Sequence, residues 1–104
     1  MSIRKIQSGD STEQLKIQVC ELLKNSPYAI ESLTIDDRHF GNVYLELRDS
    51  FRTFRFIQDR GDIYVEKKLV DTTQWIECLF LSHEEADEQY YGLLLKAVTL
   101  IATT

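Results

Sequence analysis

The sequence predicts an α+β fold in which one helix precedes a five-stranded, mostly antiparallel sheet and a second helix follows it. Between Val43 and Leu69, three alternating segments are joined by two tight turns, which is typical of consecutive antiparallel strands. On each side of the strands, apolar residues recur at helical spacing. The 104 residues suffice for a single domain, 1–104, that buries about 65% of the surface of its unfolded chain.

The first helix is expected after residues 1–9, which are compatible with either a short leading strand or a loose arm. Asp10 or Ser11 is placed to cap it, and an acidic or amide side chain follows three residues later, as in a capping box. Pro27 requires the helix to end near residues 25–27, because proline disfavours helical geometry in the residue before it. The predicted apolar face consists of Leu15, Val19, Leu22 and Leu23, with Cys20 beside them.

Five strands are predicted next, because short alternating segments follow one another with turn residues between them. The turns of the central meander fall at Asp49–Ser50 and at residues 59–62, where Gly61 suits a left-handed backbone conformation. The strands are expected at residues 30–36, 43–48, 53–57, 63–68 and 75–81.

The second helix is predicted to begin at another capping box, Ser82-His83-Glu84-Glu85. The acidic run at residues 84–88 then lies in its first turns, where exposed amide groups favour negative charge, so we interpret this run as structural. Its apolar stripe is Ala86, Tyr90, Leu93, Leu94, Ala97, Val98 and Ile101.

Both helices are expected to pack on one face of the sheet and to leave the other face open to solvent. Alternation assigns to the helix side Val43, Leu45, Leu47, Phe54, Phe56, Ile63, Val65, Ile76, Cys78 and Phe80. The opposite face then carries Tyr44, Glu46, Arg48, Thr53, Arg55, Ile57, Tyr64, Glu66, Lys68, Trp75 and Glu77. Tyrosine, tryptophan and arginine dominate the energetics of protein interfaces. We therefore predict that Tyr44, Arg55, Tyr64 and Trp75 bind a partner; the competing interpretation is cross-strand pairing within the sheet.

The composition excludes several classes of function. A formal net charge of -5 argues against binding of nucleic acid or an anionic membrane, because both need a concentrated positive field. The first residues contain no apolar stretch long enough for a signal peptide, and no later stretch approaches the length of a membrane span. We therefore expect a cytoplasmic protein. Cys20 and Cys78 lie within apolar patterns, so we interpret both as reduced core residues.

No catalytic, cofactor or metal site is predicted. Asp36, Asp37 and His39 are the nearest approach to an acid–base cluster, but no nucleophile or glycine-rich phosphate loop accompanies them. His83 and Asp87 stand at helical spacing, yet a stable zinc site needs three or four nitrogen or sulfur ligands. An enzyme with its site around Asp36, Asp37 and His39 remains as an alternative.

One segment resembles known proteins. Residues 54–66, with an Asp59-Arg60-Gly61-Asp62 hairpin and Trp75 about ten residues further on, resemble a group of small uncharacterised bacterial proteins that share this hairpin. Some of them are similar to immunity proteins, which neutralise secreted toxins. The resemblance implies a bacterial α+β protein without enzymatic activity. Within the motif, Asp59 and Asp62 are expected to hold the turn, and Arg60 to project towards a local acid or a partner.

Two hypotheses for function follow. The first is a protein-binding module, an immunity protein or inhibitor, whose acidic surface is attracted to a basic toxin. The second is a symmetric homodimer that uses the same open face in a structural or accessory role. The sequence alone does not separate them, and it names neither the partner nor the oligomeric state.

Overall fold

The computed structural model describes residues 8–36, 42–83 and 91–103, and it confirms the predicted order of one helix, five strands and one helix. The elements are α1 (Ser8–Leu22), β1 (Ala29–Asp36), β2 (Asn42–Arg48), β3 (Arg52–Asp59), β4 (Asp62–Leu69), β5 (Ile76–Leu81) and α2 (Gly92–Ala102).

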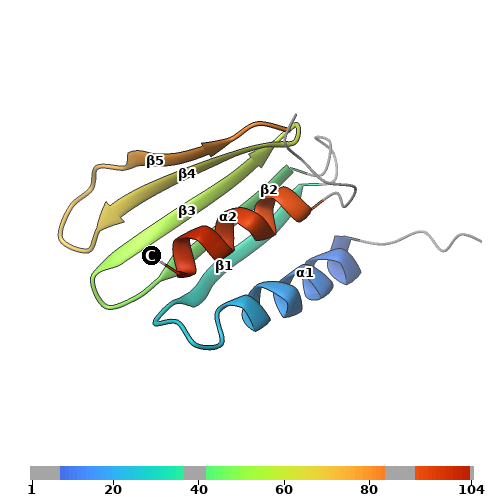
Figure 1. The fold of residues 1–104 in the computed structure, drawn as a ribbon, viewed down its shortest axis with the longest axis horizontal. Coiled ribbons are helices and arrows are strands. Elements are labelled where there is room, and N and C mark those ends of the chain that lie inside the picture. Colours follow the sequence, from blue (N-terminus) through green and yellow to red (C-terminus); the bar gives the residue numbers. More distant parts are fainter. Residues whose placement is uncertain (1–7, 37–41, 84–90, 104) are drawn as a thin grey trace, which may run out of the picture.

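The five strands form one sheet in the order in which they occur in the chain, and every neighbouring pair is antiparallel. Both helices lie on the same side of this sheet (Figure 1). Helix α1 lies along the edge strand β1, while α2 contacts β4, β5 and α1. We call the covered side the helix-side face and the other side, on which no described helix lies, the open face.

The core forms where the helix-side face meets the two helices, as predicted. The central strands contribute Val43, Leu45, Leu47, Phe54, Phe56, Ile63 and Val65, all of them buried. Helix α1 adds Leu15 and Val19, with Leu23 just after its end, and α2 adds Leu93, Leu94, Ala97, Val98 and Ile101. Alternation therefore assigns β2, β3 and β4 correctly, because tight turns connect them and hold their register.

The assignment of β5 is only partly correct. Ile76 pairs with Lys67 on the helix side, as expected, but Ile76, Cys78 and Phe80 are all exposed and not in the core, whereas Leu81 is buried and Leu79 packs against the core. The face of Phe80 differs from the prediction because of a β-bulge. Val65 pairs with Leu79 and the next residue of β4, Glu66, pairs with Glu77, so Cys78 is the extra residue. Beyond the bulge the alternation is shifted by one, which turns Phe80 to the open face.

The prediction for α1 needs three corrections. The helix begins at Ser8, so Asp10 and Ser11 lie within it and do not cap it; several residues of the cap-forming type occur in a row here, and their identity alone does not select one. Cys20 is exposed, and Leu22 is only partly covered. The buried stripe is narrow because α1 packs over the outermost strand, so residues on its flanks stay in solvent.

Several predictions lie outside the described residues. Of the strand or arm expected over residues 1–9, residues 1–7 lie outside, while Ser8 and Gly9 belong to α1. The loop residues Asp37 and His39 also lie outside, as does the part of the second capping box and apolar stripe that falls within residues 84–90. The described part of the last helix, α2, begins at Gly92.

The β3–β4 hairpin turn has the predicted geometry. Arg60 and Gly61 both have positive φ, 54° and 93°, as in the two-residue turns that match the twist of antiparallel strands. Asn42, which is buried, fastens the turn to β2: its Oδ1 accepts the Arg60 amide at 3.1 Å, and its Nδ2 donates to Asp59 Oδ1 at 3.3 Å. A Cβ on Gly61 would lie 2.8 Å from Cβ of His83, so glycine is required here for space as well as for conformation.

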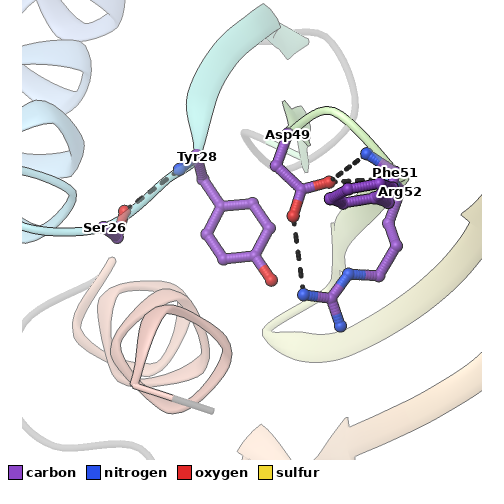
Figure 2. Close-up of polar contacts among 5 residues, drawn as sticks. All are labelled: Ser26, Tyr28, Asp49, Phe51 and Arg52. Carbon is purple, nitrogen blue, oxygen red and sulfur yellow. Dashed lines mark hydrogen bonds and ion pairs between the residues drawn. The ribbon is translucent and has the colours of Figure 1, made fainter.

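The β2–β3 turn is held by Asp49. Its Oδ1 accepts the amides of Phe51 at 2.8 Å and Arg52 at 2.7 Å, and its Oδ2 lies 3.5 Å from Nη2 of Arg52 (Figure 2). Partial burial by itself raises the pKa of Asp49, but the two amides and the guanidinium outweigh it, so the pKa lies below its usual value. The carboxylate is therefore ionised at neutral pH and fixes the turn.

Candidate protein-binding face

An apolar row crosses four of the five strands on the open face. One residue from each of β2 to β5 contributes to it, and each is paired with the next: Tyr44, Ile57, Tyr64 and Phe80. We call these four residues the apolar row; on β1 it ends at the polar residue Thr34, which is paired with Tyr44. Tyr44 is 42% exposed and Phe80 46% exposed, while Ile57 and Tyr64 between them are half-buried. The rings of Tyr64 and Phe80 are in contact, with centroids 5.1 Å apart. The row is continuous because every register step places the next side chain on the same face.

A charged row lies beside the apolar row. Its members, one from each of β2 to β5, are Glu46, Arg55, Glu66 and Glu77, and on β1 the uncharged Ser32 is paired with Glu46. At its centre, Nε and Nη2 of Arg55 both donate to Oε1 of Glu66, the first at 2.8 Å. Glu46 and Glu77 form no ion pair with any residue that the structure describes. Two carboxylates without an ion-pair partner in the described part of the chain therefore lie beside the apolar row.

Trp75 packs on the cations of the open face. The guanidinium of Arg55 lies 4.1 Å from the Trp75 ring centroid, and the ammonium of Lys68 lies 5.5 Å from it. Such cation–π contacts contribute about 0.5–1 kcal/mol at exposed sites. Trp75 and Arg55 therefore stabilise the face itself, as the competing interpretation of cross-strand pairing expected, and only the remaining exposed part of each is available to a partner.

The five predicted contact residues are not all brought together. Tyr44 and Tyr64 belong to the apolar row, Arg55 to the adjacent charged row, and Trp75 lies over Arg55. Arg60 is in the hairpin turn after β3, three residues along the chain from Ile57, and is not part of the row. That these residues bind a partner stays a prediction. The sequence analysis assigned Phe80 to the helix side and not to this face. The pattern of apolar residues does not reveal the bulge at Cys78 that changes the face of Phe80.

Asp62 and His83 connect the start of β4 to the segment that follows β5. Oδ1 of Asp62 accepts the His83 amide at 2.8 Å and lies 2.7 Å from His83 Nδ1. The amide and the imidazole together lower the pKa of Asp62. Asp62 therefore holds more than the hairpin turn for which it was expected.

Other kinds of site find little support. Within residues 8–36, 42–83 and 91–103, no three His, Cys, Asp or Glu side chains are grouped so that they could hold a metal ion. Neither described helix is long and apolar enough to cross a membrane. Asp36 ends β1, but its predicted companions Asp37 and His39 lie outside the described residues, so the alternative of an enzyme site at this loop stays a prediction.

The chain matches no protein-family model, no curated protein and no solved structure. The two rows of the open face are therefore the features from which we infer a function.

Proposed function

We propose that the chain is a non-enzymatic binding module whose open face binds a basic protein partner. The observation that carries this proposal is the apolar row. Its four residues stand on neighbouring strands about 4.8 Å apart and therefore span roughly 14 Å, which is long enough to form the centre of a protein interface. Contiguous exposed apolar surface of this kind is typical of interaction sites.

The shape and composition of the face favour a protein over a small molecule. Small-molecule sites are concave, whereas the open face is the surface of a sheet. Tyr44, Tyr64 and Phe80 provide large, rigid aromatic area, and aromatic residues are enriched at the centres of protein interfaces.

The charges favour a basic partner. Glu46 and Glu77 flank the apolar row without ion pairs of their own in the described part of the chain, and the whole chain has a formal net charge of -5. Lysine or arginine residues around an apolar centre on the partner would pair with these two carboxylates, and opposite net charges would accelerate the encounter.

The resemblance of residues 54–66 to a group of small bacterial proteins, some of which are similar to immunity proteins, supports a more specific form of the proposal. In this form the chain is a bacterial, cytoplasmic immunity protein and its partner is a basic toxin. The competing candidate is a homodimer through the same face, and it is favoured by β5, which is an edge strand of the sheet. Unpaired strand edges readily pair with a second chain.

The test is a binding measurement with matched variants. The partner is captured from the native host and purified, and its affinity is measured for the wild type, for Phe80→Glu on the open face, and for Ile17→Glu. Ile17 is 61% exposed on α1. Ile17→Glu is therefore a matched control, because it also replaces an exposed apolar side chain with glutamate, but on the other side of the molecule.

The proposal predicts that the partner carries more basic than acidic residues. It also predicts that Phe80→Glu weakens binding at least about tenfold, as expected for an aromatic residue in the centre of an interface, while Ile17→Glu binds like the wild type. Added salt should weaken the wild-type complex. Equal effects of the two variants would exclude the open face, and a wild type that associates only with itself would establish the homodimer.

A further inference from the structure

A second apolar surface lies on the helix-side face, where the C-terminal end of α2 meets β3, β4 and β5. A cleft of about 360 Å³ opens there, within the range of about 300–1,000 Å³ typical of small-molecule sites. Its apolar lining is formed by Phe54, Leu79, Leu100 and Ile101. Leu100 is on the rim and exposed. This cleft is on the other side of the sheet from the apolar row, so its function is separate from the one proposed above.

Two basic residues, Arg52 and Lys67, line this cleft. They differ in whether a carboxylate lies beside the positive charge. Arg52 lies 3.5 Å from Asp49, and its guanidinium is 5.6 Å from the Phe54 ring centroid. Lys67 is half-buried, yet it forms no hydrogen bond or ion pair with any described residue.

The two acids that adjoin Lys67 in the sheet, Glu66 and Glu77, belong to the opposite face. In the register of β4 and β5, Glu66 and Glu77 are paired with each other in the charged row of the open face, whereas Lys67 is paired with Ile76 on the helix side. A half-buried ammonium without a carboxylate beside it, in an otherwise apolar cleft, is suited to an anion that brings its own apolar body.

We propose that this cleft binds a small molecule with an apolar chain and a single carboxylate, such as a medium-chain fatty acid. The chain lies against Phe54, Leu79 and Leu100, where it removes apolar surface from water. The carboxylate pairs with the ammonium of Lys67. Arg52 is less available, because Asp49 already occupies its guanidinium (Figure 2).

The two cysteines of the chain allow ligand binding in the cleft to be measured by chemical labelling. Cys78, the extra residue of the bulge, lines the cleft, and Cys20 is an exposed cysteine on α1. Partial burial raises the pKa of the Cys78 thiol. Because a bound ligand would cover Cys78 and leave Cys20 in solvent, the rate of maleimide labelling at each cysteine reports separately on the cleft and on the rest of the surface.

The experiment measures both labelling rates in the full chain with decanoate, and with decanol and decyltrimethylammonium at the same concentrations, all below micelle formation. We expect decanoate to slow the labelling of Cys78 several-fold and to leave Cys20 unchanged, and the cationic and neutral analogues to protect Cys78 much less. Equal protection of the two cysteines, or protection of Cys78 that is the same for all three compounds, would overturn the proposal. So would an unchanged Cys78 rate with decanoate.

Variants test the role of the lysine. Lys67→Met should weaken decanoate binding about tenfold, the loss expected when a charged hydrogen bond is removed, and should leave binding of decanol unchanged. The matched control is Lys96→Met, because Lys96 lines a different apolar cleft, between α1 and α2. Thermal unfolding of both variants shows that the fold is kept. If Lys67→Met binds decanoate like the wild type, or if Lys96→Met loses the same affinity, the assigned site is wrong.

Discussion

Replacing Gln58 with methionine should stabilise the protein. Gln58 is only 1% exposed, and neither its Nε2 nor its Oε1 has a hydrogen-bond partner among the residues that the structure describes. It lies on β3 between Val43 of β2 and Ile63 of β4, both of which are fully buried. An amide in this position has given up its hydrogen bonds to water without replacement.

The expected gain follows from that loss. A buried polar group without a partner costs about 1–3 kcal/mol. Methionine is unbranched, has nearly the same length as glutamine and adapts to irregular space, so it should remove the penalty with little strain. Gln58→Met should therefore raise the free energy of unfolding by about 1–3 kcal/mol. Each gain of about 1 kcal/mol corresponds to roughly 4–8 °C in the melting temperature of a domain of this size.

The assay is thermal and urea unfolding followed by circular dichroism, with Gln74→Met as the control. Gln74 is exposed in the segment before β5, so the same substitution there should change stability by less than about 0.5 kcal/mol. A Gln58→Met variant that unfolds at a lower temperature than the wild type would show that the Gln58 amide is hydrogen-bonded in the native protein, and the reasoning would be refuted.

Three further predictions concern the core and the turns. Phe56→Ala should cost about 3–5 kcal/mol in chemical unfolding, because Phe56 is fully buried; an unchanged midpoint would contradict its place in the core. Gly61→Ala should cost about 1–3 kcal/mol, since φ is 93° and the new Cβ would meet His83 at 2.8 Å; stability equal to the wild type would show that the turn relaxes. The third concerns Asp49, whose pKa is lower in the folded state than in the unfolded chain. The contribution of the Asp49 carboxylate to the free energy of unfolding is present above its unfolded pKa of about 3.9. It is lost as the pH falls through the lower pKa of the folded state. Asp49→Asn should therefore make stability less dependent on pH below about pH 4, and an unaltered pH profile of unfolding would argue against the capped turn.

The meander of β2, β3 and β4 was predictable because local signals agree with one another. Leu45, Phe56 and Val65 alternate cleanly with polar neighbours, and two tight turns fix how the strands pair. The positive-φ turn at Gly61 was likewise marked by its residue type.

The last strand was not predictable in the same way. Five of the six residues of β5 are apolar (Ile76, Cys78, Leu79, Phe80 and Leu81), so the alternation of apolar and polar residues used to assign their faces is weak there. The bulge that fixes the face of each residue arises from pairing with β4, which is a tertiary interaction. For this reason Phe80 was assigned to the wrong face, and Cys78 was expected in the core although it is exposed.

The exposure of Cys20 has a similar origin. Helical spacing identifies the centre of a buried stripe at Leu15 and Val19, but the width of the stripe depends on what the helix packs against. Because α1 lies at the edge of the sheet, the stripe is too narrow to include Cys20. The unpaired amide of Gln58 could not be foreseen either, since it depends on which groups surround it across three strands.

The most direct test of the central proposal is site-specific photo-crosslinking in the native host, with the photoreactive residue at position 44 in one variant and at position 17 in another. Tyr44 lies in the apolar row and Ile17 on the exposed side of α1. The proposal predicts a discrete adduct between position 44 and one basic protein, and no such adduct from position 17. An adduct of position 44 only with a second copy of the chain, or adducts of the same protein from both positions, would contradict it.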